Sequence, residues 1–140
     1  MISFNYETDF KLSQSKKISK WLSDVILSEN KKEGDINYIF CDDAYLLEIN
    51  QQYLNHDTFT DIISFEYSVG NELHGDIFIS IERVKENAVN FNVPFEEELK
   101  RVMAHGVLHY CGYKDKTTTD ESLMRQKEDE KIKMFHVEQK

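Results

Sequence analysis

The most clearly defined element of this 140-residue chain is a helix predicted over residues 93–112, VPFEEELKRVMAHGVLHYCG. Pro94 suits the first turn of a helix, and the glutamates at 96–98 favour the positive end of the helix dipole. Gly112 suits the left-handed conformation in which many helices end. The sequence thus predicts one helix between these two ends. Within it, residues three or four apart lie on the same face.

The patterns on either side of this helix predict a sheet and further helices, in the order β-α-β-α-β-β-α-α-α. Alternating or β-branched runs predict strands, the last two joined as a hairpin, at 2–6, 34–42, 60–67 and 75–80. Apolar residues at helical spacing and helix-start signals predict the other helices at 14–30, 43–54, 81–91 and 119–135. The expected fold is one α+β, or mixed α/β, domain over residues 1–140, with a small sheet of about four strands and about five helices.

Polar residues next to several of these helices suit helix caps. The pair Asp42 and Asp43 stands at the start of the second predicted helix, and Ser80 stands just before the third. Thr118 and Glu121 match the S/T-x-x-E capping box at the start of the last helix. Each of these helix starts is therefore predicted by its own local signal.

Composition and charge narrow the classes of function. The chain has no apolar run of the ~20 residues that a membrane span requires, and its first residues do not match a signal peptide. Two cysteines are too few for a secreted disulfide framework, so we expect a cytoplasmic protein with reduced thiols. The net charge is −9, and residues 41–99 contain thirteen acidic residues against two basic ones. A polyanionic partner would be repelled by this segment and could dock only through local bases.

Two histidines on the best-defined helix predict a metal site. His105 and His109 are four residues apart, so they lie on one helix face and their imidazoles can meet one ion. Asp115 follows a turn at Gly112, on a loop long enough to bring its carboxylate back over both rings. Three protein ligands with an open position are typical of a catalytic site for one divalent ion, with zinc the expected metal.

Each of these residues also has an ordinary structural interpretation. Two histidines on a buried helix face are often plain packing residues, and Cys111 is read as a small buried thiol rather than a ligand. The remaining histidines are expected at turns or at the end of the last helix, as surface or capping residues: His56, His74 and His136. Glu98 lies two turns before His105 and is a weak general-base candidate, because the helix dipole already explains a carboxylate there. The small Gly106 would let another element approach the helix beside His105.

The residues around the histidine pair resemble a known family. HGVLHYCGYKD, residues 105–115, is similar to the H-G-x-L-H-x-x-G-Y-D-H signature of the YbeY endoribonuclease family of ribosomal RNA maturation factors. Residues 49–67, INQQYLNHDTFTDIISFEY, resemble that family's L-N-x-x-Y-R-x-x-D-x-P-T-D-V-L-S-F block. Residues 75–80, GDIFIS, resemble its G-D-I-x-I-S strand. The three blocks keep their order, so the resemblance is more specific than any one of them.

The resemblance implies a single-domain metalloprotein with a cleft at the histidine helix and a zinc-like ion held by three ligands. It implies a metal-dependent endoribonuclease that acts on single-stranded RNA, takes part in maturing ribosomal RNA and works with the small ribosomal subunit. The first two ligands correspond to His105 and His109. The third family histidine corresponds to Asp115, and a carboxylate can bind zinc at about the same distance.

Two further departures concern substrate binding. Leu54 stands where the family block has arginine, which would bind a phosphate bidentately, and Phe59 replaces the proline. Another base would have to contact the RNA. The bases nearest in sequence to the motif are Lys100, Arg101, Lys114 and Lys116. Of these, Arg101, Lys114 and Lys116 are the predicted substrate-binding residues. No glutamate follows His105 as in the H-E-x-x-H protease motif, so the sequence assigns no catalytic group beyond a water on the metal.

Two other functions remain open at this stage. The acidic middle segment and the missing arginine favour a non-nucleolytic ribosome-maturation factor in which a metal only organises the motif. A metal-dependent peptidase or other hydrolase is the second alternative, and the absent glutamate disfavours it. Nuclease activity that is lost with His109 would exclude the first, and a panel of protease substrates would decide the second.

Overall fold

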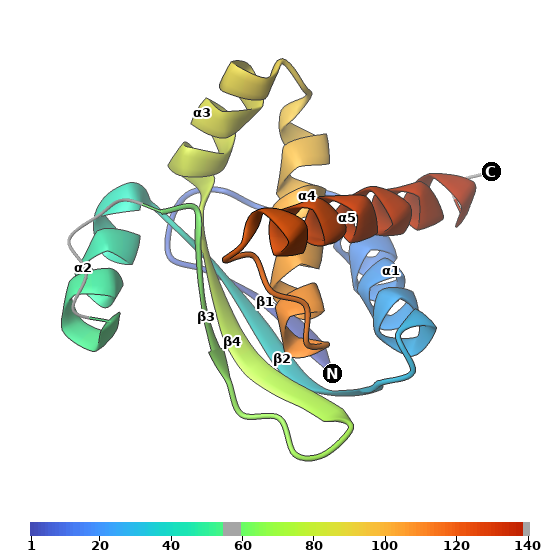
Figure 1. Cartoon of the computed structure of the whole chain (residues 1–140). Helices are drawn as coiled ribbons and strands as arrows, with labels where there is room; N and C mark the ends of the chain where they lie inside the picture. Colours follow the sequence, from blue (N-terminus) through green and yellow to red (C-terminus); the bar gives the residue numbers. More distant parts are fainter. Residues whose placement is uncertain (55–59, 139–140) are drawn as a thin grey trace.

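The computed structural model describes residues 1–54 and 60–138 (Figure 1). Its strands are β1 (Ile2–Tyr6), β2 (Lys32–Cys41), β3 (Ile62–Glu66) and β4 (Glu72–Ser80). Its helices are α1 (Ser15–Ser28), α2 (Asp43–Leu54), α3 (Ile81–Phe91), α4 (Phe95–Tyr110) and α5 (Thr118–Glu138). The predicted order of strands and helices is confirmed.

One mixed sheet contains the four strands in the spatial order β1-β2-β4-β3. Strands β1, β2 and β4 run parallel, while β3 pairs antiparallel with β4 as the edge strand. The predicted hairpin of the third and fourth strands is therefore present. Helix α4, which carries the two histidines, contacts both β3 and β4, and Ile62 at the start of β3 lies against Gly106 of α4.

The helices cover both faces of the sheet in layers. Helices α1 and α4 lie on one face, and α5 packs across both of them (Figure 1). The main core lies between these helices and the sheet and includes Trp21, Tyr38, Phe40 and Met103, all nearly or fully buried. Helix α2 covers the opposite face over a smaller cluster of Cys41, Leu46, Ile49 and Ile63. The expected α+β fold with a single small sheet is confirmed.

Local hydrogen bonds explain where the helices begin. The Ser80 hydroxyl accepts a bond from the backbone N–H of Arg83 (3.1 Å), as expected of the cap of α3. Asp42 caps α2 by accepting from the N–H of Tyr45 (2.8 Å). For α5 the prediction was wrong by one residue, since the hydroxyl that accepts from Asp120 N–H belongs to Thr117 and not to Thr118 (3.0 Å).

The end of α4 agrees with the sequence. Gly112 follows the helix with a φ of +106°, a conformation that other residues rarely adopt. The chain therefore leaves α4 at a sharp angle and turns into the loop that precedes α5. Within residues 1–54 and 60–138, no helix is long and apolar enough to cross a membrane.

Candidate metal centre

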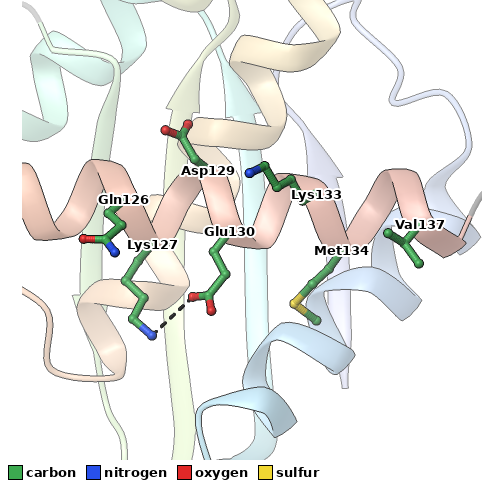
Figure 2. Close-up of a pocket in the computed structure, with 7 residues that line it drawn as sticks. All are labelled: Gln126, Lys127, Asp129, Glu130, Lys133, Met134 and Val137. Carbon is green, nitrogen blue, oxygen red and sulfur yellow. Dashed lines mark ion pairs between the residues drawn. The ribbon is translucent and has the colours of Figure 1, made fainter.

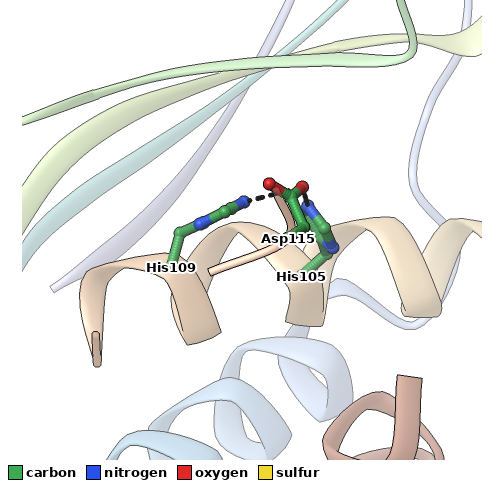
Figure 3. A group of neighbouring side chains, drawn as sticks. All are labelled: His105, His109 and Asp115. Atoms are coloured by element: carbon green, nitrogen blue, oxygen red, sulfur yellow. Dashed lines mark hydrogen bonds and ion pairs between the residues drawn. The ribbon is translucent and has the colours of Figure 1, made fainter. Parts of the chain in front are cut away.

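The two histidines lie close together near the end of α4 (Figure 3). Their ring centroids are 4.6 Å apart and the ring planes are nearly perpendicular, at 84°. Gly106, beside the first histidine, faces the sheet so closely that an added Cβ would lie 3.0 Å from Ile77 Cδ1 and 3.2 Å from Ile62 Cδ1. The expectation that this glycine admits another element is confirmed, and that element is the sheet.

Asp115 completes a group that could hold a metal ion. The loop after Gly112 returns to the helix and places Asp115 Oδ2 3.2 Å from Nε2 of His105 and 3.2 Å from Nε2 of His109. One ligand atom from each residue lies within 4.8 Å of the others, in the part of the chain that the structure describes. Two imidazole nitrogens and one carboxylate oxygen are a donor set that suits zinc and other divalent metals. The residues present therefore fit the ion that the sequence predicts.

A buried carboxylate on α5 orients the first histidine. Glu128 Oε2 lies 2.7 Å from Nδ1 of His105, and the Glu128 side chain is 6% exposed. A hydrogen bond donated by Nδ1 leaves Nε2, the nitrogen that faces Asp115, to bind a metal. Burial lowers the pKa of His105, but the hydrogen bond to Glu128 and the nearby carboxylates outweigh burial and raise the pKa above its ordinary value. A metal ion at Nε2 would have to displace the proton that these carboxylates favour.

Two clefts meet at this group. The first, of about 400 Å³, lies between the start of β3 and helices α3, α4 and α5. The second, of about 640 Å³, lies along the first turns of α5. Both clefts are lined by the same four residues, His105, Asp115, Arg125 and Glu128. An extended ligand could therefore pass over the metal group from one cleft into the other.

Two further carboxyl groups line the first cleft, Asp61 at the start of β3 and Glu98 in the first turn of α4. Burial raises the pKa of Asp61, and the charge of His105 opposes this only in part. Burial likewise raises the pKa of Glu98, against the opposing charge of Arg101. Carboxyl groups with raised pKa values suit proton transfer near neutral pH. Glu98, which the sequence suggested as a weak general-base candidate, thus lines the cleft, and Asp61 is a second candidate there.

Arg101 also lines the first cleft but is held by three carboxylates. Its Nη1 lies 2.9 Å from Asp129 Oδ1 and 3.2 Å from Glu128 Oε1, and its Nε lies 3.7 Å from Glu98 Oε1. The Arg101 side chain is 16% exposed. These contacts compensate the buried negative charges beside the metal group, so much of its capacity to bind a phosphate is already used.

The other predicted substrate-binding bases are not among the residues that line the two clefts. Lys114 and Lys116 are exposed on the loop around Asp115 and do not line either cleft. Leu54 is half exposed at the end of α2 and lies outside both cleft linings. Phe59 falls outside the described residues. A substrate-binding role for the two lysines stays a prediction.

The remaining candidates have structural explanations where the structure describes them. The expectation that His74 lies at a turn was wrong, because β4 begins at Glu72 and includes it. His74 accepts a bond from the N–H of Asp35 (3.0 Å) and contacts Glu72 (2.6 Å). His136 lies exposed near the end of α5, as expected, while His56 falls outside the described residues. Burial raises the pKa of Cys111 to about 11, so this half-buried thiol is neutral at physiological pH.

A third hollow lies away from the metal group, along α5. Its volume is about 700 Å³. Figure 2 shows the side chains that line it on α5: Gln126, Lys127, Asp129, Glu130, Lys133, Met134 and Val137. It contains no histidine or cysteine and none of the three metal-group residues. We therefore expect the reaction to take place in the two clefts beside the metal group rather than in this hollow.

Sequence reasoning missed three residues of the site: Asp61, Arg125 and Glu128. A signal for Glu128 was present, because Met124, Ile132 and Phe135 form the buried face of α5 and Glu128 has the same helical spacing. A carboxylate among core positions usually has a buried partner. Asp61 and Arg125 had no comparable local signal.

Comparison with known proteins gives a consistent result. A family model described as Endoribonuclease YbeY matches residues 2–136. A protein called Endoribonuclease YbeY from Flavobacterium psychrophilum is 74% identical over 139 residues, which cover 99% of each chain. A protein of the same name from Flavobacterium johnsoniae is 70% identical over 139 residues, or 99% of this chain and all of the relative.

A solved structure has the same overall arrangement. The solution structure of a protein from Thermotoga maritima aligns with a TM-score of 0.70 and 26% sequence identity. The alignment covers 99% of this chain and 91% of that one. The four-stranded mixed sheet with its surrounding helices is therefore shared with an experimentally solved protein.

Proposed function

This chain belongs to the YbeY endoribonuclease family, and we propose that it cleaves single-stranded RNA with one divalent metal ion bound by His105, His109 and Asp115. The endoribonuclease activity follows from full-length relatives at 70–74% identity. Metal dependence, the ligand set and the preference for single strands are the proposed parts.

One observation above all supports the metal site. A single carboxylate oxygen of Asp115 lies 3.2 Å from the Nε2 atoms of both histidines. Three donors from two separate segments, a helix and the loop after it, therefore converge on one position. The cleft around this position is open enough to leave room for substrate.

The bound ion would supply a Lewis acid for a phosphoryl oxygen of the RNA and a means of activating water. The residues of the chain hold the geometry in which this chemistry can occur. Glu128 fixes the orientation and the tautomer of His105 through Nδ1. Arg101 balances the charge of Glu128 and ties α4 to α5, so the two helices keep the cleft in shape.

Protons must also move during phosphodiester cleavage, and two carboxyl groups of the cleft are suited to this. Asp61 and Glu98 line the same cleft as the metal group, and burial raises both pKa values. Each can therefore take up or release a proton closer to neutral pH than an exposed carboxyl group can. We propose Asp61 as the first choice, because Glu98 is also engaged with Arg101.

Zinc is the proposed metal, since two imidazoles and a carboxylate are a common catalytic zinc set. Asp115 adds negative charge and is a harder ligand than imidazole, so manganese is the expected competitor. The chain is expected to act on ribosomal RNA in the cytoplasm, with the small ribosomal subunit as its partner. The proposed RNA substrate, compartment and ribosomal partner rest on family membership.

We further propose that residues 1–140 act as one domain. The main core supports this, because it joins Ile2 near the start of the chain to Phe135 near the end of α5. The metal group likewise needs α4 and the following loop, while its supporting carboxylate comes from α5. A shorter fragment would separate these parts.

The deciding experiment measures metal content and RNA cleavage on the same purified preparations of wild type and His109→Ala. We expect one divalent ion per wild-type chain, cleavage of single strands in preference to duplexes, and loss of both metal and cleavage in the variant. His74→Ala removes a histidine outside the metal group and serves as the control. Cleavage that survives complete loss of metal would refute the metal-dependent mechanism.

A further inference from the structure

The positively charged side chain of Arg125 lies where the two clefts meet, and it has no role in the proposed metal chemistry. We infer that the guanidinium of Arg125 binds a phosphate of the RNA strand next to the metal group. This inference rests on the proposed function, because it takes an RNA strand across the clefts as given. It makes Arg125 a substrate-binding residue and α5 part of the RNA-binding surface.

The position of Arg125 is the first argument. It lines both clefts, as only His105, Asp115 and Glu128 also do among the described residues. A strand that lies across the metal group must pass this junction with its phosphates. Arg125 is therefore placed to contact a backbone phosphate on either side of the bond that is cut.

The charge of the clefts is the second argument. Acidic side chains in the two linings are Asp61, Glu98, Asp115, Glu121 and Glu128, while the basic ones are Arg101 and Arg125. Without further positive charge these clefts would repel an RNA phosphate. Since Arg101 is held by three carboxylates, Arg125 is the cationic side chain of the described cleft linings that retains room for a phosphate.

The freedom of the side chain is the third argument. Arg125 is 55% exposed, and its one ion pair among the described residues is a loose contact of 3.9 Å between Nε and Glu128 Oε1. That contact involves Nε, so the two terminal nitrogens are available. Guanidinium presents such nitrogens as a planar fork that fits phosphate oxygens in pairs. Glu128 holds the base of the fork near the metal group.

The test compares Arg125→Gln with wild type under steady-state cleavage of a single-stranded RNA. We expect kcat/KM to fall about ten- to hundredfold, mainly through KM, because a charged hydrogen bond to the substrate is lost. Metal content should stay equal to that of wild type, since Arg125 is not among the three candidate ligands. Arg125→Lys keeps the charge but not the fork, and should recover only part of the loss.

Lys133→Gln is the matched control, because it removes the same charge from an exposed position of α5 outside both clefts. A second measurement separates this inference from the proposed function: binding of a fluorescent 2′-O-methyl RNA strand, which resists cleavage, at several salt concentrations. Loss of one phosphate contact should reduce the slope of log K against log salt by about 0.7. An unchanged slope in Arg125→Gln, an equal change in Lys133→Gln, or no binding by wild type would overturn the inference. Failure of wild type to cleave RNA would instead overturn the proposed function.

Discussion

Glu128 on α5 accepts a hydrogen bond from His105 on α4, with Oε2 and Nδ1 2.7 Å apart. The two residues are 23 positions apart in the sequence. This bond links the helix that provides two candidate ligands to the helix that packs across it. The geometry of the metal group therefore depends on the docking of α5 as well as on the spacing within α4.

Replacing Glu128 by glutamine should weaken metal binding without removing any ligand. The neutral amide no longer supports His105 as a carboxylate does, and such changes around metal sites typically cost about ten- to a hundredfold in affinity. Competition titration with a zinc chelator measures this directly. The control is Asp129→Asn, which removes a neighbouring charge that also contacts Arg101 (2.9 Å). Equal affinities in Glu128→Gln and wild type would contradict a role for this bond.

Asp115 should prove to be a true third ligand. Asp115→Ala leaves two imidazoles, and we expect metal occupancy after dialysis to fall to a small fraction of the wild-type value. Asp115→His replaces a hard oxygen by a softer nitrogen and should retain the ion while shifting the preference from manganese toward zinc. Metal analysis after dialysis against equal concentrations of both ions checks the shift. Full occupancy in Asp115→Ala would refute the three-ligand site.

The predictable part of this site is the local part. His105, His109 and Asp115 lie within eleven residues, so helical spacing and one turn at Gly112 bring them together. Glu128 comes from another helix, and its contact depends on how α5 crosses α4. The same limit applies to Asp61, because it reaches the cleft only through the placement of β3 at the sheet edge beyond β4.

The error at the start of α5 has a different cause. Residues 117–119 are all threonine, so more than one of them fits a capping pattern. The hydrogen bond from Asp120 N–H to the hydroxyl of Thr117 decides between them. Local sequence thus predicted the helix and the type of cap, while the exact residue depended on how the incoming loop is held.

Gly106→Ala should destabilise the fold. The added Cβ would lie 3.0 Å from Cδ1 of the fully buried Ile77, and overpacking of this kind typically costs about 1–3 kcal/mol. Alanine recovers up to about 1 kcal/mol through its higher helix propensity, so we expect a net loss of about 1 kcal/mol. Urea denaturation monitored by circular dichroism gives the free energy of unfolding.

A second substitution tests the cause of that loss. Ile77→Val removes the Cδ1 atom that the new methyl group would approach most closely. The double variant should therefore lose less stability than the two single variants added together. Strict additivity would show that the methyl group and Ile77 do not conflict.

Lys131 and Glu29 should make a pH-dependent contribution to stability. Lys131 Nζ lies 2.7 Å from Glu29 Oε2, and both side chains are largely buried between α5 and the end of α1. Burial raises the pKa of Glu29, but hydrogen bonds from Lys131 and Tyr113 outweigh burial and leave the pKa below its ordinary value of 4.5. The ionised carboxylate therefore stabilises the folded state above that value, and the contribution is lost as pH falls through the lower folded pKa.

Lys131→Met removes the buried ammonium and leaves Glu29 with weaker partners. Glu29 keeps the hydrogen bond from the Tyr113 hydroxyl (2.7 Å) and the longer contact with Lys127 (3.4 Å). At neutral pH we therefore expect a loss of about 2 kcal/mol in the free energy of unfolding, the typical value of one hydrogen bond to a charged group. The difference from wild type should shrink when both are unfolded in urea at a pH well below 4.5, because Glu29 is then neutral in both. Lys133→Met, at an exposed position two residues away, should change stability little at either pH. A loss in Lys131→Met that is the same at both pH values would indicate lost packing rather than lost charge pairing.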